Sequence, residues 1–146
     1  ERQVTLADPE LAKAVSGLKR ARTGSDRLLM HRDGKDWRPL DSQDVNERLH
    51  ELVGDEFTVK DLRTWNATVL AAVILAGRKG QGGKRTAVRE MYKEVAHHLG
   101  NTPAIARKSY VDPRVVEAFE QGDTIRPSTD LDRVERAVAR LLARSR

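Results

Sequence analysis

One stretch decides the fold: Ala67-Thr68-Val69-Leu70-Ala71-Ala72-Val73-Ile74-Leu75-Ala76, a ten-residue run without a charged side chain. The run is long enough for nearly three helical turns, and it is apolar on nearly every side. A helix that is apolar all round is usually buried in the centre of a domain. We therefore expect a central helix that is capped by Thr58 and ends at about Gly77.

Amphipathic patterns on both sides of this run predict further helices, each begun by a capping residue or a Pro at the first helical position. The polar residues around Asp33-Gly34 predict a β-hairpin, and residues 4–6 are typical of the end of a strand. The fold class is therefore mainly α, a multi-helix domain with a small β-hairpin near the N-terminus. We expect residues 1–122 to form this domain, and residues 123–146 to form a linker and a C-terminal helix that docks on it. The expected helix starts are Asp8-Pro9, Asp41-Ser42, Thr86, Thr102-Pro103, Asp112-Pro113 and Asp130.

Composition excludes several classes of protein. The 146 residues contain no cysteine, so neither a disulfide framework nor a thiolate metal site can form. The four histidines do not show metal-ligand spacing. No signal peptide is visible, and no uncharged run approaches the ~20 residues that span a bilayer. We expect an intracellular, cytoplasmic protein without a metal or other cofactor.

Positive charge is concentrated in the middle of the chain. Residues 57–110 carry ten Lys and Arg against three Asp and Glu, whereas residues 1–56 carry ten against twelve and residues 111–146 seven against seven. A basic segment of this kind suits a polyanion, and nucleic acid is the common one. An ordinary solvated surface remains the alternative.

The glycine-rich loop at residues 78–85 contains four cations but is not a nucleotide-binding loop. A Walker motif with Lys84 as its lysine would need Gly at position 78 and Ser or Thr at position 85. Both positions are Arg. Lys84 and Arg85 are instead candidates for contacts with a nucleic-acid backbone. A plain solvated loop is the competing interpretation.

Arg63 falls at the edge of the predicted buried face of the central helix. A buried guanidinium needs a partner, and this helix offers no acid one turn away on that face. Either Arg63 pairs with a carboxylate from elsewhere in the fold, or its partner is a phosphate that arrives with a substrate. The planar fork of arginine matches phosphate oxygens in a bidentate manner.

The segment from Leu99 to Tyr110 ends one helix and begins the next. Gly100 fits a helix C-cap, Thr102 the next N-cap, and the turn between them holds Asn101 with its amide free to donate. Arg107 and Lys108 precede Tyr110. Because a free phenol ionises only near pH 10, attack on a phosphodiester needs cations nearby. Residue types alone also fit a tyrosine on an amphipathic surface.

Two other features have ordinary interpretations. Tyr92 lies on the apolar stripe of its helix, which predicts a core residue. The apolar stripe of the final helix predicts docking on the body of the same chain.

Two motifs resemble one enzyme family. Lys60-Asp61-Leu62-Arg63-Thr64-Trp65-Asn66-Ala67, together with Leu99-Gly100-Asn101-Thr102-Pro103-Ala104 and Arg107-Lys108-Ser109-Tyr110, is similar to the catalytic domain of bacterial, poxvirus-like type IB DNA topoisomerases. The similarity extends from about Val4 to about Glu117. It implies that Tyr110 is the nucleophile, that Arg63 is the helix-borne arginine, and that Asn101 stands where many members have histidine. Lys60 matches a family lysine near the DNA backbone.

The resemblance also implies a reaction. The family cleaves one strand of duplex DNA, forms a 3′-phosphotyrosyl link, allows rotation and religates, without metal or ATP. Its members use a further arginine and a hairpin lysine upstream of the region that matches Val4. We therefore expect this chain to be the C-terminal part of a larger catalytic domain, weak or inactive alone. Its expected partners are double-stranded DNA and the upstream part of the polypeptide, in a monomeric protein of the bacterial nucleoid.

Two alternatives stay open. A tyrosine recombinase or integrase shares the plan of a helix arginine and a turn that leads to tyrosine. Recombinases usually carry His-x-x-Arg and Leu-Gly-His where this chain has Lys60-x-x-Arg63 and Leu99-Gly100-Asn101, which favours the topoisomerase. The second alternative is a basic DNA-binding module without catalysis.

Overall fold

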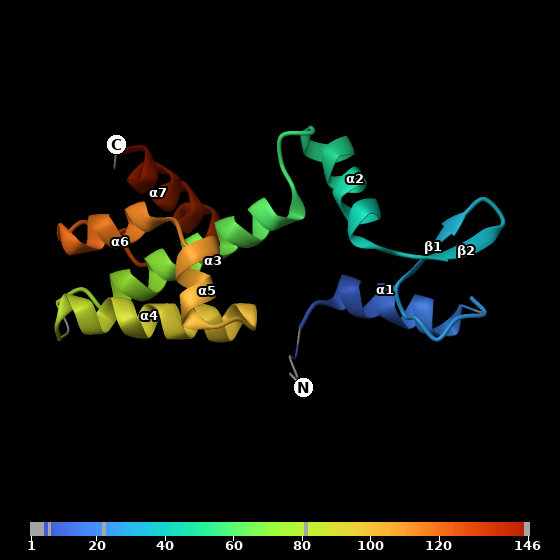
Figure 1. Cartoon of the computed structure of the whole chain (residues 1–146), viewed down its shortest axis with the longest axis horizontal. Coiled ribbons are helices and arrows are strands. Elements are labelled where there is room, and N and C mark those ends of the chain that lie inside the picture. Colours follow the sequence, from blue (N-terminus) through green and yellow to red (C-terminus); the bar gives the residue numbers. More distant parts are fainter. Residues whose placement is uncertain (1–4, 6, 22, 81, 145–146) are drawn as a thin grey trace. The chain divides into compact units, whose positions relative to one another are not determined.

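The computed structural model describes residues 5, 7–21, 23–80 and 82–144, and it is mainly α-helical with one β-hairpin, as the sequence predicts (Figure 1). The strand expected at Val4–Leu6 falls largely outside these residues. The backbone divides into two compact units, Glu1–Val59 and Lys60–Arg146. The described elements are α1 (Pro9–Arg20), β1 (Met30–Asp33), β2 (Asp36–Pro39), α2 (Ser42–Val53), α3 (Val59–Gly77), α4 (Lys84–Leu99), α5 (Pro103–Ser109), α6 (Pro113–Glu120) and α7 (Leu131–Arg144).

The helices of the first unit begin where the sequence predicts. The Asp8 carboxylate accepts a 2.9 Å hydrogen bond from the Leu11 N–H at the start of α1. Asp41 and Asp44 form a reciprocal capping box at the start of α2. Such caps satisfy N–H groups that have no partner inside the helix.

The strands β1 and β2 form the predicted antiparallel hairpin. Met30 pairs with Pro39 and Asp33 with Asp36, so Gly34-Lys35 is a two-residue turn. Gly34 has φ 60°, the left-handed conformation that a tight hairpin turn requires.

The first unit buries little apolar surface. Among its described residues, Met30 is the one buried hydrophobic side chain. Helices α1 and α2 bury none, and Leu52, Val53 and Phe57 are exposed. The main core therefore belongs to the second unit.

Helix α3 is the centre of the second unit. Its second half is buried as predicted, with Ala67 and Ala71 fully inaccessible and Leu75 1% exposed. Around it pack Met91 and Val95 of α4 and parts of the other helices. No helix within the described residues, α3 included, is long and apolar enough to cross a membrane.

Helix α4 begins at Lys84, two residues before the predicted start at Thr86, so that prediction is wrong. Gly83 occupies the N-cap position without a side-chain hydrogen bond. Of the first turn only Ala87 is buried, whereas Lys84, Arg85 and Thr86 are exposed. The added first residue, Lys84, donates to the Glu120 carbonyl of α6, a contact between helices that local capping rules do not include.

Helices α6 and α7 contribute buried side chains to the core of the second unit. Val115 and Phe119 of α6 and Val138 and Leu141 of α7 are buried. The Arg114 guanidinium also donates to the carbonyl oxygen of Leu142 at 3.1 Å. The predicted apolar stripe of the final helix thus faces the other helices of its own unit.

Candidate functional site

A tight turn separates α4 from α5 and holds Asn101. Gly100 caps α4 with φ 72°, and the Asn101 N–H donates to the carbonyl oxygen of Ala96 at 2.9 Å. Thr102 then caps α5 by accepting from the Ile105 N–H at 3.3 Å. These bonds fix the backbone on both sides of Asn101, as the sequence predicts.

The side-chain amide of Asn101 is a buried donor. Its Nδ2 atom is inaccessible to solvent and has no hydrogen-bond partner within the described residues. A buried polar group without a partner is unusual in proteins. Asn101 therefore keeps an unused donor in the turn that leads to Tyr110.

Tyr110 lies directly after α5, at its C-cap. Its N–H donates to the Ala106 carbonyl oxygen at 3.1 Å, and its half-buried ring packs against the core of the second unit. The ring is thus held by the protein while the side chain remains partly accessible.

Arg63 connects the two ends of this segment. Its Nη2 atom donates to the Leu99 carbonyl oxygen at 2.6 Å, and its Cζ atom lies 5.2 Å from the centre of the Tyr110 ring. The second distance is within the range of a cation–π interaction. The structure therefore places one guanidinium beside both the Asn101 turn and the tyrosine.

The surroundings of Arg63 differ from the prediction. Arg63 is exposed rather than at the edge of the buried face, because the first turns of α3 project beyond the core and burial begins at Ala67. No carboxylate pairs with Arg63 among the described residues; its contacts are a carbonyl and an aromatic ring. Its remaining N–H groups are not bound to an acid.

Thr68 is a residue of this site that the sequence did not reveal. Its side chain is 1% exposed, and its hydroxyl accepts from the Asp112 N–H at 3.1 Å. The same hydroxyl lies within donating distance of the carbonyl oxygens of Thr64 at 2.8 Å and Tyr110 at 3.3 Å. It contacts the backbone on both sides of Val111. The available signal was a single hydroxyl within an otherwise apolar run.

Asp112 secures the chain that follows the tyrosine. Its carboxylate accepts from the Arg114 guanidinium at 2.7 Å and caps α6 through the Arg114 N–H. The hydrogen bond from Arg114 lowers the pKa of Asp112 below its usual value, and partial burial opposes the shift. The Asp112–Arg114 pair therefore fixes the start of α6 two residues after Tyr110 in the sequence.

The predicted backbone-binding cations fall into separate groups. Lys60 and Lys108 are exposed. Lys84 is also exposed and donates from Nζ to the Glu120 carbonyl oxygen at 2.6 Å, which leaves two of its three ammonium N–H groups for other acceptors. Arg85 and Arg107 share a pocket. Of the predicted side chains, only Arg63 and Tyr110 contact one another through an interaction seen in the described part of the chain.

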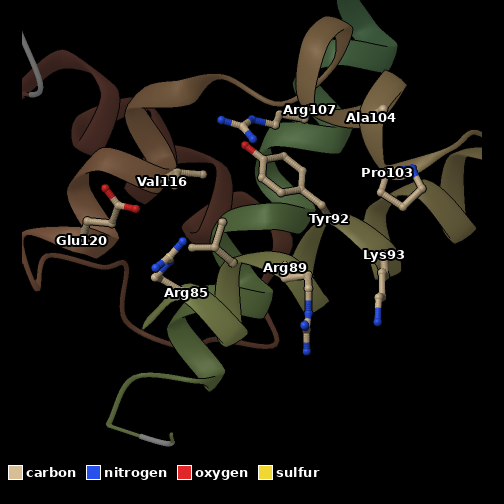
Figure 2. A pocket seen from close by; sticks show the side chains of 10 residues that line it. Arg85, Arg89, Tyr92, Lys93, Pro103, Ala104, Arg107, Val116 and Glu120 are labelled. Atoms are coloured by element: carbon tan, nitrogen blue, oxygen red, sulfur yellow. The ribbon is translucent and has the colours of Figure 1, made fainter. Parts of the chain in front are cut away.

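The Arg85–Arg107 pocket lies between α4, α5 and α6 and has a volume of about 530 Å³ (Figure 2). Tyr92 lines it and is half-buried, so the predicted core residue also faces solvent. Burial raises the pKa of the Tyr92 hydroxyl; Arg107 opposes this shift and Glu120 adds to it. This phenol stays neutral at ordinary pH.

No group of three or more His, Cys, Asp or Glu side chains within the described ranges could hold a metal ion. His97 and His98 are both exposed on α4. The groups that Arg63, Asn101 and Tyr110 bring to the candidate site are a guanidinium, an amide and a phenol.

Two comparisons with known proteins agree with one another. The family model described as eukaryotic DNA topoisomerase I, catalytic core, matches residues 3–131. Over 87 residues the chain is 30% identical to a protein of Acanthamoeba polyphaga mimivirus named DNA topoisomerase 1B. That alignment covers 56% of this chain and 26% of the relative, so the chain matches about a quarter of the relative's length.

Proposed function

Since the chain belongs to the family of the eukaryotic DNA topoisomerase I catalytic core, we propose that it is part of a type IB DNA topoisomerase in which Tyr110 is the nucleophile. The observation that carries the proposal is the position of Arg63. One guanidinium contacts the Leu99 carbonyl and the Tyr110 ring, so a phosphate held by its free N–H groups would lie near the phenol.

The reaction is a transesterification. The Tyr110 oxygen attacks the phosphorus of a DNA phosphodiester, the Tyr–O–P bond forms, and the bond from phosphorus to the 5′ oxygen breaks. The phenol proton leaves to a base and a proton reaches the 5′ oxygen, so no net proton, electron or nucleotide is consumed. Rotation of the free end followed by the reverse attack relaxes a supercoil.

Arg63 and Asn101 supply the fixed donors that the transition state needs. Charge builds on the non-bridging oxygens during phosphoryl transfer, and donors already in position stabilise it. The Leu99 carbonyl holds one Nη atom of Arg63, which leaves the rest of the fork for phosphate. The second donor is the unpartnered Nδ2 atom of Asn101, which is buried in this structure and reaches a phosphate once the side-chain amide turns outward.

Other parts of the proposal come from the relative and from the charge. The chain matches about a quarter of the mimivirus topoisomerase, and we propose that preceding parts of a longer polypeptide supply the further arginine and the general acid. The cations that contact the duplex backbone are Lys60, Lys84, Arg85, Arg107 and Lys108. Under this proposal one copy of the chain acts on DNA, in a nucleoid if the host is a bacterium.

The test uses the longer polypeptide that contains this chain and a nicked duplex that traps the covalent intermediate. The chain has two tyrosines, and both lie near an arginine, so Tyr92→Phe is a matched control for Tyr110→Phe. We expect Y110F to abolish the DNA adduct and Y92F to retain it. Peptide mapping of the adduct identifies the linked residue.

An adduct that survives Y110F, or that Y92F removes equally, would refute the assignment of Tyr110. Relaxation of a plasmid without specific sites separates a topoisomerase from a recombinase. A recombinase cleaves only near its own sites and leaves such a plasmid supercoiled.

A further inference from the structure

We infer that the Arg85–Arg107 pocket binds a nucleoside phosphate, with the phosphate between the two arginines and the base against the Tyr92 ring. Arg85 and Arg107 are two of the cations that the proposed function places on the duplex backbone, so this inference rests on that function and adds a base-binding wall to the two arginines. The volume of the pocket, about 530 Å³, is within the range of about 300–1,000 Å³ that is typical of small-molecule sites.

The two arginines come from different walls of the pocket. Arg85 lies in the first turn of α4 and Arg107 in α5. Both are exposed, and neither forms an ion pair within the described part of the chain. Two guanidinium groups from different helices can bind several oxygens of one phosphate, whereas a carboxylate ligand offers only two oxygens.

The rim adds positive charge that is only partly neutralised. Arg89 and Lys93 both pair with Glu90, at 3.2 and 3.0 Å, so one carboxylate serves two cations. Glu120 is the one acid that lines the pocket among the described residues. Its own backbone carbonyl is held by the Lys84 ammonium group. The pocket therefore keeps a net positive charge.

The lining of the pocket also includes an aromatic ring and apolar side chains. Tyr92 presents its half-buried ring there, beside Val88, Ala104 and Val116. Figure 2 shows the Tyr92 hydroxyl turned toward Arg107, while Arg89 and Lys93 extend away from the ring. An aromatic face next to free guanidinium groups suits a base joined to a phosphate. Neither inorganic phosphate nor an acidic peptide would use both features.

The experiment is calorimetric titration of the 146-residue chain with thymidine 5′-monophosphate. Arg85→Gln and Arg107→Gln should each weaken binding roughly tenfold or more, which is the size of one lost charge-assisted hydrogen bond. Arg136→Gln is the matched control, because Arg136 is exposed on α7 and lies outside the pocket. It should leave binding unchanged.

Several outcomes would overturn the inference. They are the absence of nucleotide binding, an equal loss in R136Q, equal binding of inorganic phosphate, and displacement of the nucleotide by a polyglutamate peptide. Competition with a duplex oligonucleotide then shows whether the nucleotide that the pocket binds is part of a DNA strand or is free. If the duplex displaces the nucleotide, the pocket binds a nucleotide of the DNA strand; if both bind together, the pocket binds a free nucleotide. Either result supports a nucleoside-phosphate site.

Failure of this inference is distinguishable from failure of the proposed function. The titration measures binding by α4 and α5 residues and does not need cleavage. The adduct experiment measures covalent chemistry at Tyr110, and neither Y110F nor Y92F removes a pocket arginine.

Discussion

Replacing Thr68 by Val removes one hydroxyl from the centre of the second unit and leaves the shape of the side chain nearly unchanged. The hydroxyl is the acceptor for the Asp112 N–H at 3.1 Å and lies 3.3 Å from the Tyr110 carbonyl oxygen. Thr68→Val should therefore destabilise the fold and also loosen the backbone that carries Tyr110.

The expected loss follows from the groups left without partners. The Asp112 N–H loses its acceptor in a partly buried position, which costs about 1–3 kcal/mol of unfolding free energy. The Thr64 carbonyl keeps its ordinary helical partner. No cavity forms, because valine fills the volume of threonine. Each kcal/mol lowers the melting temperature of a unit of this size by roughly 4–8 °C.

Thr64→Val is the matched control. Thr64 lies one turn earlier on α3, is only partly buried, and its hydroxyl bonds the Lys60 carbonyl of its own helix at 2.9 Å. We expect it to change the unfolding free energy by less than about 0.5 kcal/mol. Denaturant unfolding of the chain measures both variants. Equal effects of T68V and T64V would refute the argument.

Thr68→Ser separates positioning from stability. Serine keeps the hydroxyl and loses a buried methyl group, which costs about 1 kcal/mol. In the longer polypeptide T68S should retain DNA cleavage, whereas T68V should slow it by up to about 100-fold with DNA binding unchanged. Equal slowing by T68S and T68V would show that Thr68 acts through stability alone.

Three further predictions concern other elements. Asp112→Asn should destabilise the chain at pH 7. Because the pKa of Asp112 is lowered by folding, its contribution is present above pH about 4 and is lost as the pH falls. The gap in unfolding free energy between D112N and the unmodified chain should therefore shrink steadily as the pH falls below about 4, and a constant gap would contradict this. Leu75→Ala should cost about 2–5 kcal/mol in denaturant unfolding, because Leu75 is 1% exposed in the core; a loss under 1 kcal/mol would contradict the central position of α3. Arg63→Lys should preserve the melting temperature within about 2 °C, since Arg63 is exposed, but should lower adduct formation in the longer polypeptide by at least about tenfold, because lysine lacks the planar fork.

The sequence predicted the features that depend on neighbouring residues. The apolar run from Ala67 identified the buried helix, and Gly100 with Thr102 identified the turn, because caps and turns act over a few residues. The hairpin at Gly34 was predicted for the same reason. The start of α4 was misplaced because local capping rules favour Thr86, whereas the helix begins at Lys84, after Gly83.

The contacts of the candidate site could not be predicted in this way. Arg63 meets the Leu99 carbonyl 36 residues away, and Thr68 meets the Asp112 N–H 44 residues away. Lys84 meets the Glu120 carbonyl across 36 residues, a contact that the residue types of the loop did not indicate. Sequence spacing indicates which face a residue occupies, but the partner on that face is set by the packing of whole helices.

Helix α3 contacts the segment from Leu99 to Tyr110 at two separate places. Arg63 meets the carbonyl that ends α4, and Thr68 meets the carbonyl of Tyr110. Five residues of helix separate these positions by about 7.5 Å along the axis and about 140° around it. The segment from Leu99 to Tyr110 therefore crosses the surface of α3 instead of following one face. A shift of α5 alone would have to break the contact at Thr68, and a shift of α4 the contact at Arg63. This is why a single buried hydroxyl in an apolar helix belongs to the functional site as much as to the core.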